Sequence, residues 1–506
     1  MSSSKKSYSS ILKSSSLIGG SEALTFLIGM ITTKAVAVFL GPLGVGLSGT
    51  YGSILTLATR LSDFGISSSG VREIAAAIGS RDDAIVGRSV CTLRRICWLT
   101  GLLGSGAVAL FARPISQATF GSTEYAWAIM LLAWTILMRN IQNGQMVYIQ
   151  GSRRIGDLAR LKIIGEIGGA TIGVGFYAWL RLDGIVPAMI SLAAFNLAAS
   201  WWFARKAPPP RVVMTWKESL IQSKGFVLFG AAFMYVGVLA AAGPYLTRLM
   251  LNRELSMDAV GIFQSAFRMS VFFVNFVLGA MGTDFYPRLA MESSDHSKMC
   301  RSVNEQTEIG LLIAIPGLIA MLAFAPWVIR IFYTSAFLES AKLLNWFVLG
   351  CLLRVITAPM GFILPAKGLG RWFSASHTFY NVLNLFLIFI LIKQYNVLGV
   401  AIAYFVSSLA HGLLIYGFAR YLIGFSWTAT TRKLLIFLLP LAGGQFMAAM
   451  LLPELQTAAI GILTTAGASF FCFYELGARV GEDHKIFRMI RKVPFLGPKM
   501  LNLIFR

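Results

Sequence analysis

Apolar runs of roughly 20 residues recur along the whole chain, separated by short polar segments. Wound as an α-helix, a run of that length crosses a hydrocarbon core about 30 Å thick. Because backbone N–H and C=O groups have no water to bind inside a bilayer, each run is predicted to be helical. The pattern predicts fourteen spans, over residues 17–39, 43–65, 90–112, 123–148, 158–180, 184–204, 225–249, 259–283, 306–332, 340–363, 372–393, 397–419, 433–452 and 456–477.

Composition agrees with this pattern. Hydrophobic residues make up 56% of the 506 positions and charged residues only 13%, whereas soluble domains average about 25% charged residues. The alternative, core helices of a large soluble protein, requires a polar surface that this composition does not provide. The predicted fold class is therefore an all-α polytopic membrane protein.

Lysine and arginine are distributed unevenly over the segments between spans. If the N-terminus is cytoplasmic, the inside segments are strongly basic and the outside segments hold only Arg113, Arg181, Arg248, Arg253, Arg330, Lys342 and Lys393. This bias predicts that both termini lie in the cytoplasm. It also explains the net charge of +22 by loops that face anionic headgroups, so no nucleic-acid partner is expected. The five cysteines show no metal-ligand spacing and are interpreted as apolar filler.

Short sequences recur at an offset of 215 residues. Val45-Gly46-Leu47 returns as Val260-Gly261-Ile262, Gly184-Ile185 as Gly399-Val400, and Phe203-Ala204-Arg205 as Phe418-Ala419-Arg420. The offset predicts two pseudo-symmetric six-helix lobes of equal orientation, with the substrate bound between them. The predicted segments are an N-terminal cytoplasmic tail (1–16), an N-lobe (17–204), a linker (205–224), a C-lobe (225–419), two further spans (420–477) and a basic cytoplasmic tail (478–506).

Five cations fall inside the predicted spans: Lys34, Arg60, Arg139, Arg268 and Arg354. Each costs about 2.5–3.5 kcal/mol at a helix centre facing lipid, so they are expected to face a hydrated cavity or an internal partner. Gln264, Asn275, His377 and Asn381 are predicted to add polar lining. Because acids are fewer, the lining is predicted to bind an anion, and the planar guanidinium suits phosphate oxygens.

Each of these assignments has an alternative. Arg60 can pair with Asp63 as a tie within its helix, and Lys34 can extend to the membrane interface. Histidines at helix contacts are more often packing residues than proton carriers. The acids considered for ion coupling are Glu22, Glu166 and Asp63.

The stretch Phe39-Leu-Gly-Pro-Leu-Gly-Val-Gly46, followed by Leu61-Ser-Asp-Phe-Gly-Ile-Ser-Ser-Ser-Gly-Val-Arg-Glu73, resembles Wzx-type polysaccharide flippases. These belong to the multidrug/oligosaccharidyl-lipid/polysaccharide (MOP) exporter superfamily. The resemblance implies a V-shaped, two-lobed transporter of the bacterial inner membrane, used in O-antigen or exopolysaccharide assembly. It implies that undecaprenyl-diphosphate-linked glycans are moved to the periplasmic leaflet, with the five cations as candidates for a cationic central cavity.

The partners that the resemblance implies are the lipid-linked glycan, membrane lipids, and the polymerase and chain-length proteins of polysaccharide assembly. No cofactor is expected beyond a proton or sodium gradient, and no ATP-binding loop or zinc motif is present in the sequence. The nearest alternative is a MurJ-type lipid II flippase, whose basic cluster also lies on spans one, two and eight. A drug exporter of the same superfamily, which would favour an acidic cavity, and a membrane glycosyltransferase or ligase are the remaining alternatives.

Overall fold

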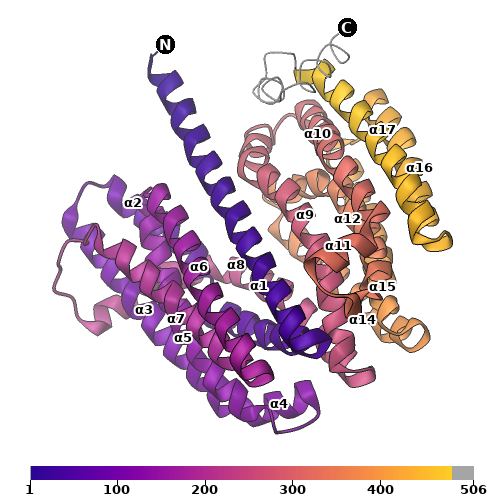
Figure 1. Ribbon diagram of the computed structural model, residues 1–506. Coiled ribbons are helices and arrows are strands. Elements are labelled where there is room, and N and C mark those ends of the chain that lie inside the picture. Colours follow the sequence, from indigo (N-terminus) through magenta and orange to yellow (C-terminus); the bar gives the residue numbers. More distant parts are fainter. Residues whose placement is uncertain (1, 481–506) are drawn as a thin grey trace, which may run out of the picture. The chain divides into compact units, whose positions relative to one another are not determined.

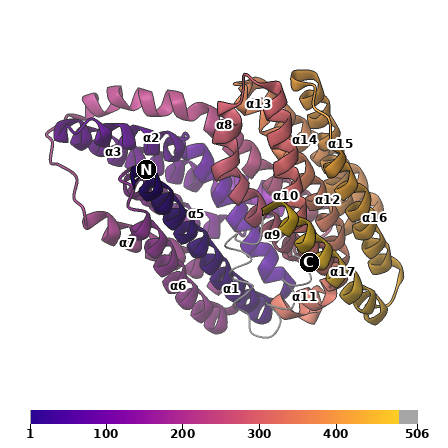
Figure 2. The ribbon, with the colours of Figure 1, turned by 90° about the horizontal axis from the view of Figure 1, so that it is seen from above.

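The regular structure of the described chain is helical throughout in the computed structural model (Figure 1). The structure describes the backbone of residues 2–480. It describes their side chains except at residues 2–23, 26, 225–229, 231–233, 272–284, 287 and 478–480. The chain divides into two compact units. In both views the helices of each unit run side by side as a bundle (Figures 1 and 2).

Unit 1 comprises Met1–Gly261 and the short segment Phe332–Ala336. Its main helix pairs are α1 with α6, α3 with α5, and α6 with α7. Its elements are α1 (Ser2–Asp63), α2 (Ile66–Gly79), α3 (Asp83–Leu110), α4 (Ala112–Phe120), α5 (Ala126–Gly151), α6 (Ile155–Leu180), η1 (Arg181–Gly184), α7 (Ile185–Arg205) and α8 (Trp216–Glu254).

Unit 2 comprises Ile262–Ile331 and Phe337–Arg506, and its main helix pairs are α12 with α15 and α14 with α15. Helix α9 (Met257–Met291) starts in unit 1 and continues in unit 2. The other elements are α10 (His296–Ala323), α11 (Ala325–Phe332), η2 (Ser335–Phe337), α12 (Ser340–Gly361), α13 (Ile363–Ala366), α14 (Gly370–Tyr395), α15 (Val397–Ile423), α16 (Ala429–Leu451) and α17 (Glu454–Val480).

The predicted spans fall on these helices, and 306–332 covers both α10 and α11. The predicted count of fourteen is not confirmed. By length and hydropathy, nine helical segments of the described chain can cross a membrane, or ten with the bent pair α3–α4. One of the nine, Ile155–Arg205, has 51 residues and contains both α6 and α7. At 1.5 Å per residue, the length of a straight 51-residue helix would far exceed the thickness of a hydrocarbon core, which is about 30 Å.

The first two predicted spans form one continuous helix that is kinked at Gly41. This residue has φ 64° and ψ −163°, and Pro42 follows it. The left-handed backbone suits glycine, which has no Cβ to clash. Residues 2–16, which were predicted to be a tail, are also helical in α1, since no glycine or proline interrupts the chain before Gly19.

The internal repeat is visible in the backbone. Arg181 and Asn396, which are 215 positions apart, both have φ 52°, with ψ −127° and −138°. A Cβ on Gly184 would lie under 3.0 Å from the Phe176 carbonyl oxygen, and a Cβ on Gly399 would lie equally close to that of Leu391. Both contacts occupy equivalent positions of the predicted repeat, so the same helix–turn–helix recurs in each unit.

Candidate functional site

The five predicted cations are divided between the units. Lys34, Arg60 and Arg139 belong to unit 1, whereas Arg268 and Arg354 belong to unit 2. A cluster around Arg354 has the best-defined polar contacts of the five.

Arg354 lies on α12 and is bound by a phenol rather than a carboxylate. Its guanidinium donates a hydrogen bond of 3.2 Å to the Tyr404 hydroxyl on α15. Tyr404 is buried, and the rings of Phe267 and Phe347 pack edge-on against it. Among the described residues, no acid forms an ion pair with Arg354. A cation held by a neutral partner keeps a full charge with which to attract an anion.

Two histidines adjoin this cluster. The rings of His377 on α14 and His411 on α15 lie 5.6 Å apart, and the Tyr380 ring lies 5.5 Å from that of His411. The His377 ring also packs at 4.5 Å against Phe373. Both histidines interact electrostatically with Arg354. They therefore belong to the same polar region of unit 2, whereas the role of His377 as cavity lining stays a prediction.

Asn381 forms a hydrogen bond with the backbone of this region. Its amide donates a 2.8 Å hydrogen bond to the His377 carbonyl oxygen, one turn earlier on α14. One turn later, the Asn384 amide donates at 3.3 Å to Ser407 on α15. The polar stripe predicted on this helix is thus used in part to join α14 to α15.

Unit 1 brings a predicted cation and a predicted acid together. Arg139 on α5 interacts electrostatically with Glu166 on α6. The neighbouring Asn140 is buried and donates a 2.9 Å hydrogen bond to Ser62 on α1. Three helices thus contribute polar groups to one region of this unit.

Arg60 and Asp63 interact electrostatically but do not form the direct ion pair that was considered. The Asp63 carboxylate instead accepts hydrogen bonds of 2.6 Å from the Ser67 hydroxyl and 3.2 Å from its backbone N–H. Asp63 therefore stabilises the turn from α1 into α2, and Arg60 is exposed beside Gly237. The Lys34 ammonium donates to the Tyr333 carbonyl oxygen, so it has an internal partner.

Four predicted residues remain. Arg268 on α9 is exposed and Gln264, one turn earlier, is half-buried. The side chains of Glu22 and Asn275 lie outside the described residues.

Sequence reasoning missed two groups. Tyr404 and Tyr380 are absent from the predicted lining because a tyrosine within an apolar run gives no periodic signal. Glu308 is 8% exposed inside α10 and accepts hydrogen bonds from Thr431 at 2.7 Å and Thr428 at 3.2 Å. Thr428 is the N-cap of α16, and an acid near a helix N-terminus is stabilising. The sequence signal that could have identified Glu308 is the presence of an acid within the predicted span 306–332.

Comparison with known proteins assigns the family. A family model described as "polysaccharide biosynthesis protein" matches residues 35–342, more than half of the 506 positions. The chain belongs to this family. One relative that matches by sequence is the lipid III flippase of Escherichia coli (strain K12). It is 23% identical to this chain over 423 residues, which cover 81% of this chain and 98% of the relative.

Two solved structures share the fold of this chain. The lipid II flippase MurJ in an inward closed conformation matches with a TM-score of 0.69 and 15% identity, over 91% of this chain and 99% of that one. An inward-facing multidrug resistance MATE family transporter of the MOP superfamily matches with a TM-score of 0.65 and 13% identity, over 81% and 96%.

These comparisons confirm three predictions from the sequence. The all-α polytopic fold is confirmed by the two structures. The resemblance to MOP-superfamily polysaccharide flippases is confirmed, as is the prediction of a transporter rather than an enzyme. The chain is thus a multi-pass membrane transporter of the polysaccharide biosynthesis family.

Proposed function

We propose that this transporter flips undecaprenyl-diphosphate-linked oligosaccharides from the cytoplasmic to the periplasmic leaflet of the bacterial inner membrane. It works by alternating access of its two repeats, with both termini in the cytoplasm. Membership of the polysaccharide biosynthesis family supports a glycan cargo, and the flippase among the relatives supports lipid-linked transport. The observation that carries the proposal is the contact of Arg354 with a phenol, because such a cation can bind the diphosphate without first releasing a carboxylate.

In this proposal the other cations act at successive points of the path. Arg60 is exposed and can meet the diphosphate first, whereas Arg139 is half-buried beside Glu166. Arg268 and Lys34 complete the cationic lining that the sequence predicts, with Gln264, Asn275, His377 and Asn381 as its neutral polar part. The glycan crosses through the hydrated lining while the polyprenyl tail stays in lipid.

Substitution of Arg354 tests the proposal. Arg354→Ala is expected to abolish glycan export in cells and flipping of a labelled lipid-linked oligosaccharide in proteoliposomes, with protein levels in the membrane maintained. Tyr404→Phe keeps the ring and the charge, so it should retain most activity. Arg330→Ala is the matched control, because Arg330 also lies half-buried in unit 2 but is paired with the carboxylate of Glu454 at 2.9 Å. Normal export by both Arg354→Ala and Arg139→Ala would refute the charge-based mechanism.

A lipid II flippase is the second candidate, since the MurJ fold covers 91% of this chain. Complementation separates the two functions. Rescue of a strain depleted of its lipid II flippase would favour lipid II as cargo, whereas rescue of surface polysaccharide in a flippase-null strain supports our proposal.

We also propose that an ion gradient drives transport through Glu166. Its interaction with Arg139 supports this choice, because a cargo phosphate that takes over Arg139 would change the proton affinity of the acid. Glu166→Gln should then flip cargo down its gradient but lose stimulation by an imposed proton or sodium gradient. Equal stimulation of wild type and variant by both gradients would exclude Glu166.

A further inference from the structure

Unit 1 contains a cavity that the predicted transport path does not use. Its volume is about 1080 Å³, and it is lined by α3, α5, α7 and the segment 208–212 that leads to α8. None of the predicted site residues lines it. Cavities that bind drug-sized molecules have volumes of about 300–1,000 Å³, so this one can hold a headgroup together with part of an acyl chain.

The lining is divided between cations and apolar groups. All its charged residues are arginines, namely Arg94, Arg95, Arg205 and Arg211. The rest is mainly apolar and includes Trp98, Trp201, Leu197, Ile141 and Met138. A cluster of guanidinium groups without an acid in the lining is suited to a phosphate.

One of the four arginines is structural. Arg95 donates hydrogen bonds to the carbonyl oxygens of Met214 and Thr215, both at 2.8 Å, and to the Ser219 hydroxyl at 2.9 Å. It therefore ties α3 to the start of α8. The linker wall is also fixed at Gly87, where an added Cβ would come within 3.0 Å of Val212 and of the Pro210 carbonyl oxygen. The cavity is thus built by the fold.

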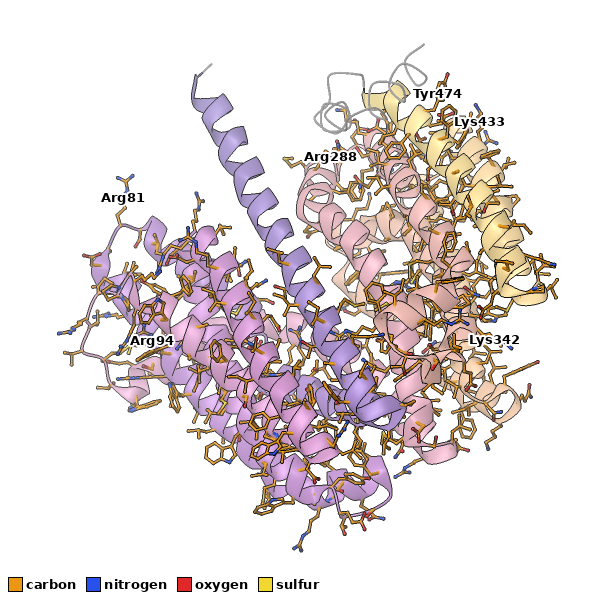
Figure 3. The ribbon with its side chains drawn as sticks, in the orientation of Figure 1. Arg81, Arg94, Arg288, Lys342, Lys433 and Tyr474 are labelled. Atoms are coloured by element: carbon orange, nitrogen blue, oxygen red, sulfur yellow. The ribbon has the colours of Figure 1, made fainter. Side chains whose placement is uncertain are left out.

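The other three arginines can serve a ligand. Among the described residues, Arg94, Arg205 and Arg211 form no ion pair. All three are exposed, and Arg94 projects from α3 in Figure 3. The Arg205 guanidinium stacks 3.6 Å from the centroid of the Trp201 ring. Stacking uses the face of the guanidinium and leaves its in-plane N–H groups available as donors.

The apolar part of the cavity favours a lipid as the ligand. Trp98 and Trp201 are 49% and 48% exposed beside the arginines, and tryptophan is enriched at the membrane interface. We propose that this cavity binds an anionic glycerophospholipid of the cytoplasmic leaflet, with its phosphate on Arg94, Arg205 and Arg211 and an acyl chain against α5 and α7. The bound lipid joins α3 and α7 to the linker that starts α8.

Native mass spectrometry of the purified full chain tests this inference. The wild type is titrated with phosphatidylglycerol and with phosphatidylcholine. It should retain one molecule of phosphatidylglycerol in preference to phosphatidylcholine. The variant R94Q/R205Q/R211Q should bind phosphatidylglycerol at least about tenfold more weakly, since each cation near an anionic lipid contributes about 1 kcal/mol. Arg420→Gln is the matched control, because Arg420 is the repeat equivalent of Arg205 and does not line the cavity. It should bind as the wild type does.

A second variant occupies the cavity without removing charge. Ala198 lines the wall on α7, so Ala198→Phe should also displace the retained lipid. Equal binding of the two lipids by the wild type, or unchanged binding by both variants, would overturn the proposal. Displacement of phosphatidylglycerol by inorganic pyrophosphate would overturn it in favour of a soluble phosphate. Displacement by undecaprenyl diphosphate, but not by pyrophosphate, would identify the cavity as a cargo site and overturn the assignment to a phospholipid.

Discussion

Alanine at the two repeat-related glycines should destabilise the protein to a similar extent in each unit. A Cβ at position 184 or 399 would approach a backbone carbonyl oxygen, of Phe176 or Leu391, to less than 3.0 Å. Backbone atoms cannot rotate away as a side chain can, so the helix pair must separate. Overpacking of this kind typically costs about 1–3 kcal/mol. For a unit of this size, the melting temperature should fall by roughly 2–12 °C.

The assay is thermal unfolding in detergent, followed by the fluorescence of the 11 tryptophans. Gly175→Ala in α6 and Gly417→Ala in α15 are the controls, since a Cβ at either position meets nothing within 4 Å. They should be neutral or raise stability by up to about 1 kcal/mol, because alanine is the better helix former. If Gly184→Ala and Gly399→Ala unfold like these controls, the turn does not have the close packing described here. A large loss at only one position would refute its equivalence in the two units.

Two further predictions concern polar groups at helix starts. Glu308→Ala should cost about 1–3 kcal/mol, because the hydroxyls of Thr428 and Thr431 both lose a hydrogen bond to a buried carboxylate. A melting temperature equal to that of Lys342→Ala, an exposed control in unit 2, would contradict this. Asp295 accepts a 3.0 Å hydrogen bond from the Lys298 backbone N–H, which lowers its pKa below the ordinary value. Because a lowered pKa stabilises the folded state above the unfolded pKa of about 3.9, Asp295→Ala should lower the melting temperature at pH 7. That difference should shrink as the pH falls below about 4, and a constant difference down to pH 3 would be evidence against a charged cap.

The spans could be predicted from the sequence because the bilayer sets the length of an apolar run. The run 184–204 matches α7 (Ile185–Arg205), and 397–419 matches α15 (Val397–Ile423). Elements that do not follow this rule were missed. Helix α4 (Ala112–Phe120) is too short to span, and the start of α1 is too polar. The positive φ of the repeated turn at Arg181 and Asn396 also could not be predicted from the sequence, because neither position holds the glycine that a positive φ favours.

The candidate site could be predicted only in part, because a span reveals a charge but not its partner. Arg354 and His377 could be named from the cost of polar groups in lipid. The partner of Arg354 is 50 positions away on another helix, and no periodicity within one span identifies it. Asp63 shows the converse case. Its spacing from Arg60 fits a pair on one helix, but a local hydroxyl and N–H at Ser67 bind the carboxylate instead.

The contact between Arg354 and Tyr404 has an energetic consequence for transport. An arginine at the centre of a span costs about 2.5–3.5 kcal/mol, and a hydrogen bond to a charged group returns about 1.5–3 kcal/mol. Tyr404 therefore offsets much of the cost of the cation without neutralising it. A carboxylate partner would bind the cation more strongly and would compete with an arriving phosphate. In the proposed mechanism, the phenol stabilises the arginine in the empty transporter and leaves its charge for the cargo, as a reversible anion site inside a membrane requires.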